Sequence, residues 1–181
     1  YSDRVIQNVI MSDYLTPVVF FKQMCHHLVG IDLSFLDNCS NILLIREPSL
    51  VIRSHAKNVP DLKVSDIGLD IQNFLLNKIL ESGETPVVVD SANLLMQPEA
   101  ILKELCQHLE IAFDSSMLSW EPGEKPEDGV WAKYWYKSLH QTSGFREHKP
   151  KSHFPQGLES LLMECKPYYE KLYKQTLKAN E

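Results

Sequence analysis

The sequence predicts an α/β fold in which the strands of a parallel sheet are joined and flanked by helices. Three short runs, Pro17–Phe21, Asn41–Ile45 and Pro86–Val89, have the apolar, β-branched composition of buried parallel strands. Apolar residues recur at helical spacing between and after these runs, as helical crossovers between parallel strands require. This alternation favours a three-layer parallel sheet with helices on both faces.

Composition and charge narrow the class of protein. The 181 residues are 44% hydrophobic and 23% charged, which suits a single domain over residues 1–181 with a full core. The net charge of −6 argues against nucleic acid or an anionic membrane as a partner. No apolar run has the length of a membrane span and no signal-peptide pattern is visible, so we expect a cytoplasmic protein. The oligomeric state stays open.

Two short helices are expected around the first strand. Apolar residues at helical spacing predict one over Asp3–Met11. A second is expected over Gln23–Val29, because Gly30 can end a helix in the left-handed conformation. Lys22 stands at the exit of the strand that separates the two helices.

Longer helices are expected after the second strand and on either side of the third. Pro48 suits the first turn of the helix that follows Asn41–Ile45. The apolar pattern predicts a long helix over Val64–Ser82 that Gly83 ends. A further helix is expected over Pro98–Leu109, where proline again suits the first turn.

The C-terminal third begins with a loop. Two prolines and two glycines make Ser119–Gly129 a loop, and the aromatic segment Trp131–Leu139 is expected to be helical. Thr142–Pro155 reads as irregular structure. An apolar stripe predicts a closing helix over Gln156–Lys178, which Pro167 should kink or divide.

The junction between the second strand and its helix contains the strongest candidate for a binding site. Arg46 follows the strand and Ser54 lies eight residues further on, about one and a half turns into the helix. Ligands of α/β sheets bind at the carboxyl ends of strands, where a guanidinium and a hydroxyl can share one anion. The pair is therefore a candidate phosphate clamp. The alternative is a solvated turn in which Arg46 pairs with Glu47 or another carboxylate.

Lys22 and the adjacent histidines His26 and His27 are the candidate catalytic residues. An ammonium can neutralise charge on a transferring phosphoryl or sulfuryl group. His26 lies four residues after Lys22, so a helix that begins near Lys22 places both on roughly the same face. An imidazole titrates near neutral pH and can accept the proton of a hydroxyl. The alternative is a solvated lysine followed by a surface or core histidine pair.

The cysteines and histidines lack the spacing of a metal site. The four cysteines are scattered and show no CxxC pair, so we expect reduced thiols and no metal. These cysteines are Cys25, Cys39, Cys106 and Cys165. The residues also contain no GxxxxGK[ST] sequence, the usual cradle for a diphosphate.

An aromatic stretch, Gly129–Phe145, has two interpretations. Its tryptophans and tyrosines offer large rigid faces that can stack an adenine or shape a pocket. A satellite core beneath a loop would have the same composition. Cationic side chains in or just after the stretch can add positive potential, or can belong to a solvated helical face. They are Lys133, Lys137, His140 and Arg146.

Taken together, these segments resemble the P-loop sulfotransferases. LLIREPSLVIRS is similar to the family's strand, turn and helix, and VVVDSANLLMQPEAILKELCQHLEI to its strand with an acidic exit and a proline-started helix. CKPYYEKLY is similar to the family's closing helix. MLSWEPGEKPEDGVWAKYWYKSLHQTSGF resembles a branch that occurs alone or fused to branched-chain aminotransferase-like domains.

The resemblance implies a function and roles for the residues. Family members transfer a sulfuryl group from 3′-phosphoadenosine 5′-phosphosulfate to a hydroxyl or amine without a metal. By this match Arg46 and Ser54 bind the 3′-phosphate, and the partners are the nucleotide and a small-molecule acceptor. The family's 5′-phosphosulfate loop and first strand are placed before Tyr1, so residues 1–181 are expected to be an N-terminally incomplete domain. Met24 stands where the family has a histidine two residues after Lys22, so His26 or His27 is the substitute.

Two alternatives to a sulfotransferase remain. The chain can be a non-catalytic nucleotide-binding or interaction module, or a P-loop kinase-like phosphotransferase, because one fold class hosts all three functions.

Overall fold

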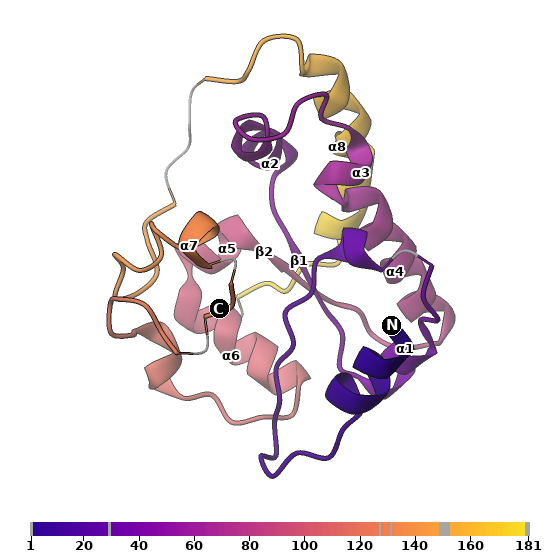
Figure 1. Cartoon of the computed structure of the whole chain (residues 1–181), viewed down its shortest axis with the longest axis vertical. Coiled ribbons are helices and arrows are strands. Elements are labelled where there is room, and N and C mark those ends of the chain that lie inside the picture. The colour runs from indigo at the N-terminus through magenta and orange to yellow at the C-terminus, as the bar shows by residue number, and fades with distance from the viewer. Residues whose placement is uncertain (1, 29, 127, 131, 149–152, 180–181) are drawn as a thin grey trace.

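The computed structural model describes residues 2–28, 30–126, 128–130, 132–148 and 153–179 (Figure 1). Within these ranges the regular elements are α1 (Ser2–Val5), β1 (Ile42–Ile45), α2 (Pro48–His55), α3 (Val64–Ile67), α4 (Leu69–Glu81), β2 (Val87–Asp90), α5 (Ser91–Met96), α6 (Pro98–His108), α7 (Ala132–Trp135) and α8 (Glu159–Tyr173). A π-helical turn covers Ile6–Ile10, and 3₁₀ turns cover Cys25–His27, Ser34–Asn38 and Ser115–Leu118. The fold is α/β, as predicted.

A small parallel sheet lies at the centre of the fold. β1 and β2 pair in parallel, with Ile42 opposite Val87 and Ile45 opposite Asp90. The chain after α8 returns to the other edge of β2, where the amide of Leu177 donates to the carbonyl of Val88 over 2.9 Å. β2 therefore lies between β1 and the C-terminal segment.

Alternate side chains of β2 pack into two different apolar clusters, as the two-residue period of a strand requires. Val88 is fully buried in the larger cluster, which α2, α4 and α8 complete. Val87 and Val89 lie in a smaller cluster with Ile101 of α6 and Leu177. Helices thus cover both faces of this strand, which explains why its apolar run is continuous.

The buried carboxylate of Asp90 connects the exit of β2 to two helices. Asp90 is 1% exposed, and its Oδ1 accepts from the amides of Ala92 and Asn93 at 2.9 and 3.1 Å, capping α5. Its Oδ2 accepts from the hydroxyl of Tyr169 on α8 at 2.9 Å. Burial and the neighbouring Asp90 carboxylate raise the pKa of Tyr169 well above its usual value. The phenol therefore remains a donor to Asp90 at neutral pH.

The prediction of a first strand over Pro17–Phe21 is wrong. Pro17–Phe21 has no regular structure, and Val18 and Phe20 are 55% and 76% exposed. The run has the composition of a strand, but in the described part of the chain no strand pairs with it. Strand propensity mostly reflects packing against neighbours, so composition without a partner does not make a strand.

Two predicted helices in the first half are interrupted or shortened. Gly68 adopts a left-handed conformation with φ of +77° and divides the predicted helix Val64–Ser82 into α3 and α4. Glycine tolerates this conformation, while the apolar pattern continues across the break. The helix predicted over Gln23–Val29 is only the 3₁₀ turn Cys25–His27, and Val29 lies outside the described residues.

The C-terminal helices also differ from the prediction. α8 is one helix that contains Pro167, so the proline does not divide it, and the predicted kink stays a prediction. Asn73 of α4 donates to the carbonyl of Tyr168 at 2.8 Å, which ties α8 to α4 beside the proline. The helix expected over Trp131–Leu139 is limited to α7, with Trp131 outside the described residues. No helix in the described ranges combines the length and apolarity needed to cross a bilayer.

Truncation of Leu172 tests the packing of α8 on the core. Leu172 is fully buried, so we expect Leu172→Ala to lower the free energy of unfolding by about 2–5 kcal/mol. The matched control is Met163→Ala on the same helix, because Met163 is 63% exposed and its loss should cost about 0.5 kcal/mol or less. Denaturant unfolding measures both. Equal losses in the two variants would contradict the packing described.

Candidate functional site

The candidate site begins at the junction of β1 and α2. Glu47 caps α2, because its carboxylate accepts from the amides of Ser49 and Leu50, both at 3.2 Å, and from the hydroxyl of Ser49. Pro48 is buried in the first turn, where its fixed φ suits a helix. The sequence therefore turns from strand to helix within two residues of Arg46.

Burial fixes the orientation of α2. Ile52 is fully buried in the larger apolar cluster, so its face of the helix turns inward. Ser54, two residues later and about 200° around a helix of 3.6 residues per turn, is exposed. Arg46 is exposed at the end of β1. Both predicted clamp residues are therefore accessible to a ligand.

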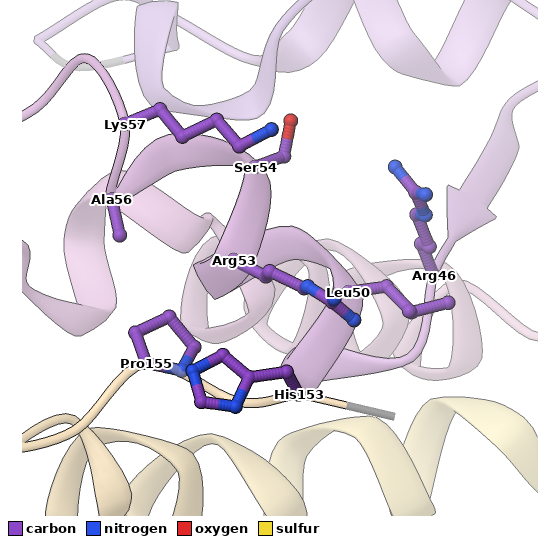
Figure 2. A pocket seen from close by; sticks show the side chains of 8 residues that line it. All are labelled: Arg46, Leu50, Arg53, Ser54, Ala56, Lys57, His153 and Pro155. Atoms are coloured by element: carbon purple, nitrogen blue, oxygen red, sulfur yellow. The ribbon is translucent and has the colours of Figure 1, made fainter. Parts of the chain in front are cut away.

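Arg46 and Ser54 line the same cavity, which has a volume of about 480 Å³ (Figure 2). The lining consists mainly of α2 and the turns at its two ends, completed by two residues from the segment before α8. These residues are Arg46, Leu50, Arg53, Ser54, Ala56, Lys57, His153 and Pro155. The structure thus brings the two predicted residues together at the carboxyl end of a parallel strand.

The side chain of Arg46 is available for a ligand. The carboxylate of Glu47 is committed to the cap of α2, and in the described part of the chain no ion pair joins Arg46 to any carboxylate. A guanidinium that is exposed, unpaired and at a cavity wall can bind an anion in a bidentate manner. The alternative in which Arg46 pairs with Glu47 is therefore not seen in the described structure, and the clamp stays a prediction.

Three further polar residues of the cavity were missed from the sequence. Lys57 lies three residues after Ser54, a spacing that places both on one side of a helical surface, and Arg53 directly precedes Ser54. That signal was available in the sequence. His153 reaches the cavity from the irregular segment before α8, and no local pattern could reveal this contact.

Lys22, His26 and His27 do not line this cavity. Lys22 is exposed in an irregular segment, and the histidines belong to the 3₁₀ turn that packs on α4. The two imidazole rings meet edge to face with centroids 4.5 Å apart. The predicted catalytic residues are therefore separate from the predicted clamp.

His26 has a perturbed titration. Burial, and then the neighbouring imidazoles of His27 and His55, lower its pKa below 6.5. His55 belongs to the last turn of α2, with its Nδ1 atom 3.1 Å from the carbonyl of Val51. A neutral imidazole at neutral pH is the form that a general base requires.

The end of the aromatic stretch packs against the segment that precedes it. The rings of Trp120 and Phe145 pack edge to face at 5.5 Å, and the indole of Trp120 donates to the hydroxyl of buried Thr142 at 3.1 Å. His140 pairs with Asp128 over 2.8 Å, which pins the preceding loop. Tyr134 of the same stretch is 66% exposed, and Trp131 lies outside the described residues.

The cysteines are free thiols, as the sequence predicts. Cys165 is fully buried, and burial raises its pKa to about 11, so it is protonated at neutral pH. Among the described residues, no three or more histidine, cysteine, aspartate or glutamate side chains are arranged to hold a metal ion.

The structure is that of an α/β protein with a cation-lined cavity at a strand-to-helix junction. A sequence model of the sulfotransferase domain matches residues 3–176. The chain belongs to this family, which confirms the resemblance seen in the sequence.

Two curated relatives come from Arabidopsis thaliana. Branched-chain-amino-acid aminotransferase-like proteins 2 and 1 are each 33% identical to this chain, over 169 and 170 residues. Each alignment covers 92% of the chain and 30% of the relative, so the chain spans about a third of the length of these proteins. Their names agree with the aminotransferase-like branch in the resemblance. No solved structure matches the chain significantly.

The titration of His26 can be measured directly by following its ring protons by NMR from pH 5 to 8. We expect a midpoint below 6.5, and an upward shift in His55→Gln, which removes one of the neighbouring imidazoles. Because the folded state disfavours protonation, stability from His26 is present above pH 6.5 and is lost as the pH falls through its folded pKa. A midpoint at or above 6.5 would contradict the described surroundings of His26.

Proposed function

We propose that this chain is the nucleotide-binding part of a sulfotransferase that uses 3′-phosphoadenosine 5′-phosphosulfate. The 3′-phosphate binds in the cavity between Arg46 and Ser54, and the acceptor is a hydroxyl or amine of a small molecule. The family's 5′-phosphosulfate loop, which the resemblance places before Tyr1, holds the other end of the nucleotide. We also propose that the complete domain has the three-layer architecture of the family, a parallel sheet with helices on both faces.

One observation carries the proposal. Arg46 and Ser54, predicted as a pair from their spacing, line one cavity in which no described residue presents a carboxylate. The guanidinium supplies charge and two parallel donors, and the hydroxyl supplies a third donor from the facing helix. These groups match the oxygens of a phosphate. Membership in the sulfotransferase domain family supports a sulfuryl donor as the source of that phosphate.

The proposed reaction is an in-line displacement at sulfur. The acceptor oxygen or nitrogen forms a bond to sulfur while the bond from sulfur to the 5′-phosphate oxygen breaks, and that oxygen leaves with the electron pair. His26 or His27 takes the acceptor proton, and Lys22 stabilises charge on the sulfuryl group or the bridging oxygen. The product nucleotide is adenosine 3′,5′-bisphosphate. The lowered pKa of His26 keeps its imidazole neutral at neutral pH, the form that can take the acceptor proton.

A nucleotide-binding module without transfer activity is the second candidate. The observation that favours it is the separation of Lys22, His26 and His27 from the cavity that holds Arg46 and Ser54. Sulfuryl transfer from a radiolabelled donor by the full-length protein distinguishes the two. Transfer that is abolished in the His26→Ala, His27→Ala double variant supports the enzyme, whereas nucleotide binding without transfer supports the module.

Calorimetry with adenosine 3′,5′-bisphosphate tests the clamp. Loss of a hydrogen bond to a charged group costs about 1.5–3 kcal/mol, so we expect Arg46→Ala to weaken binding roughly ten- to hundredfold. Ser54→Ala should weaken binding less, and neither variant should change the affinity for adenosine 5′-phosphate, which lacks the 3′-phosphate.

Arg4→Ala is the matched control, because Arg4 is an exposed arginine of α1 that does not line the cavity. Its affinity should equal that of the wild type. Unchanged bisphosphate affinity in Arg46→Ala would refute the clamp.

A further inference from the structure

The cavity contains more positive charge than one clamp residue provides. Three permanently charged cations, Arg46, Arg53 and Lys57, line it together with the imidazole of His153. Among the described lining residues none carries a carboxylate. This local excess occurs in a chain with a net charge of −6.

Within the described part of the chain, the cations of the cavity have no carboxylate partner. The ion pairs of the described residues involve Lys78, Lys103 and His140, and none involves Arg46, Arg53 or Lys57. Like charges at one cavity repel each other, which disfavours the folded state unless an anion offsets the repulsion. The arrangement indicates an anionic ligand with more than one charge.

The dipole of α2 explains the positions of only some of these cations. Arg53 and Lys57 lie at the C-terminal end of α2, where cations are stabilised by the exposed carbonyl groups. Arg46 precedes the other end of the helix, where the dipole disfavours a cation. A helix-end effect therefore cannot account for the convergence of all three.

The side chains divide into two groups in the cavity (Figure 2). Lys57 extends from the turn after α2 toward Ser54, while Arg46 projects from the end of β1 on the other side. The guanidinium of Arg53 ends beside Leu50 and points away from Ser54. Lys57 is therefore the cation whose ammonium lies next to Ser54, with Arg46 across the cavity.

We propose that Lys57 determines specificity at this site by matching the second negative charge of a phosphate monoester. A phosphate monoester carries nearly two charges at neutral pH, whereas a phosphodiester carries one. Arg46 is sufficient for a singly charged group, and the ammonium of Lys57 adds a point charge for the second. The cavity thus prefers a terminal phosphate monoester. This inference rests on the proposed nucleotide site at the same cavity.

The test compares two ligands by calorimetry. They are adenosine 3′,5′-bisphosphate and the methyl diester of its 3′-phosphate, which differ by one charge at the proposed site. We expect the wild type to bind the monoester roughly tenfold more tightly. Lys57→Gln should weaken monoester binding about tenfold and diester binding by less than about twofold, on the scale of one charge-assisted contact.

Three controls separate charge from structure. Lys57→Arg should keep the preference, and Lys166→Gln, which removes an exposed lysine of α8 outside the cavity, should leave both affinities unchanged. The effect of Lys57→Gln should shrink as salt rises from 0.05 to 0.5 M, roughly as the Debye length shortens. The thermal midpoint of Lys57→Gln should match that of the wild type.

The experiment distinguishes a failure of the proposed nucleotide site from a failure of the proposed role of Lys57. If Arg46→Ala weakens bisphosphate binding but Lys57→Gln affects neither ligand, or both equally, the nucleotide site stands and the role of Lys57 is refuted. If the wild type binds neither ligand, the nucleotide site and this inference both fall.

Discussion

The cap that Glu47 places on α2 is the constraint on which the candidate site depends. A carboxylate next to an arginine would ordinarily be its nearest ion-pair partner, but Glu47 instead satisfies the free amides at the start of the helix. This single interaction has two effects. It fixes the direction in which α2 leaves β1, and it leaves the guanidinium of Arg46 without a partner in the described structure. Buried Pro48 and Ile52 then hold the helix against the core.

The cavity concentrates positive charge on an acidic protein. Overall charge repels a nucleotide at long range, so recognition requires cations that are concentrated at one place and kept free of carboxylates. The carboxylates nearest to the exits of the strands have other partners. Glu47 caps α2, and Asp90 caps α5 while it accepts from Tyr169. In the described part of the chain, neither carboxylate forms an ion pair with a cation of the cavity.

Sequence patterns within short windows predicted the strands and helices whose formation depends mainly on neighbouring residues. The strands near Leu43 and Val88 and the helix that Pro48 begins were all found, because composition and helix-start signals agree there with tertiary packing. The break at Gly68 is visible in the sequence as a glycine, but the apolar period continues through it. Pro17–Phe21 could not be judged from its composition, because a strand also requires a neighbour.

For the candidate site, too, the sequence predicted the residues that belong to a local pattern and not those that the tertiary fold brings in. Arg46 and Ser54 follow from the rule that ligands bind where parallel strands end, and Lys57 shares the helical surface of Ser54. The contribution of His153 depends on the path of the whole chain between α2 and α8. No pattern in a short window contains that information.

Consecutive residues of α2 connect the two candidate regions. Ser54 lines the cavity, whereas His55 lies close enough to His26 to lower its pKa. Adjacent helical residues differ in direction by about 100°, so the cavity and the histidine turn lie against neighbouring sides of the same helix. Ser54 and His55 belong to α2, whereas the turn that carries His26 packs on α4. A change in the start of α2 would therefore displace the cavity and His55 relative to His26, which makes the Glu47 cap a determinant of their relative geometry.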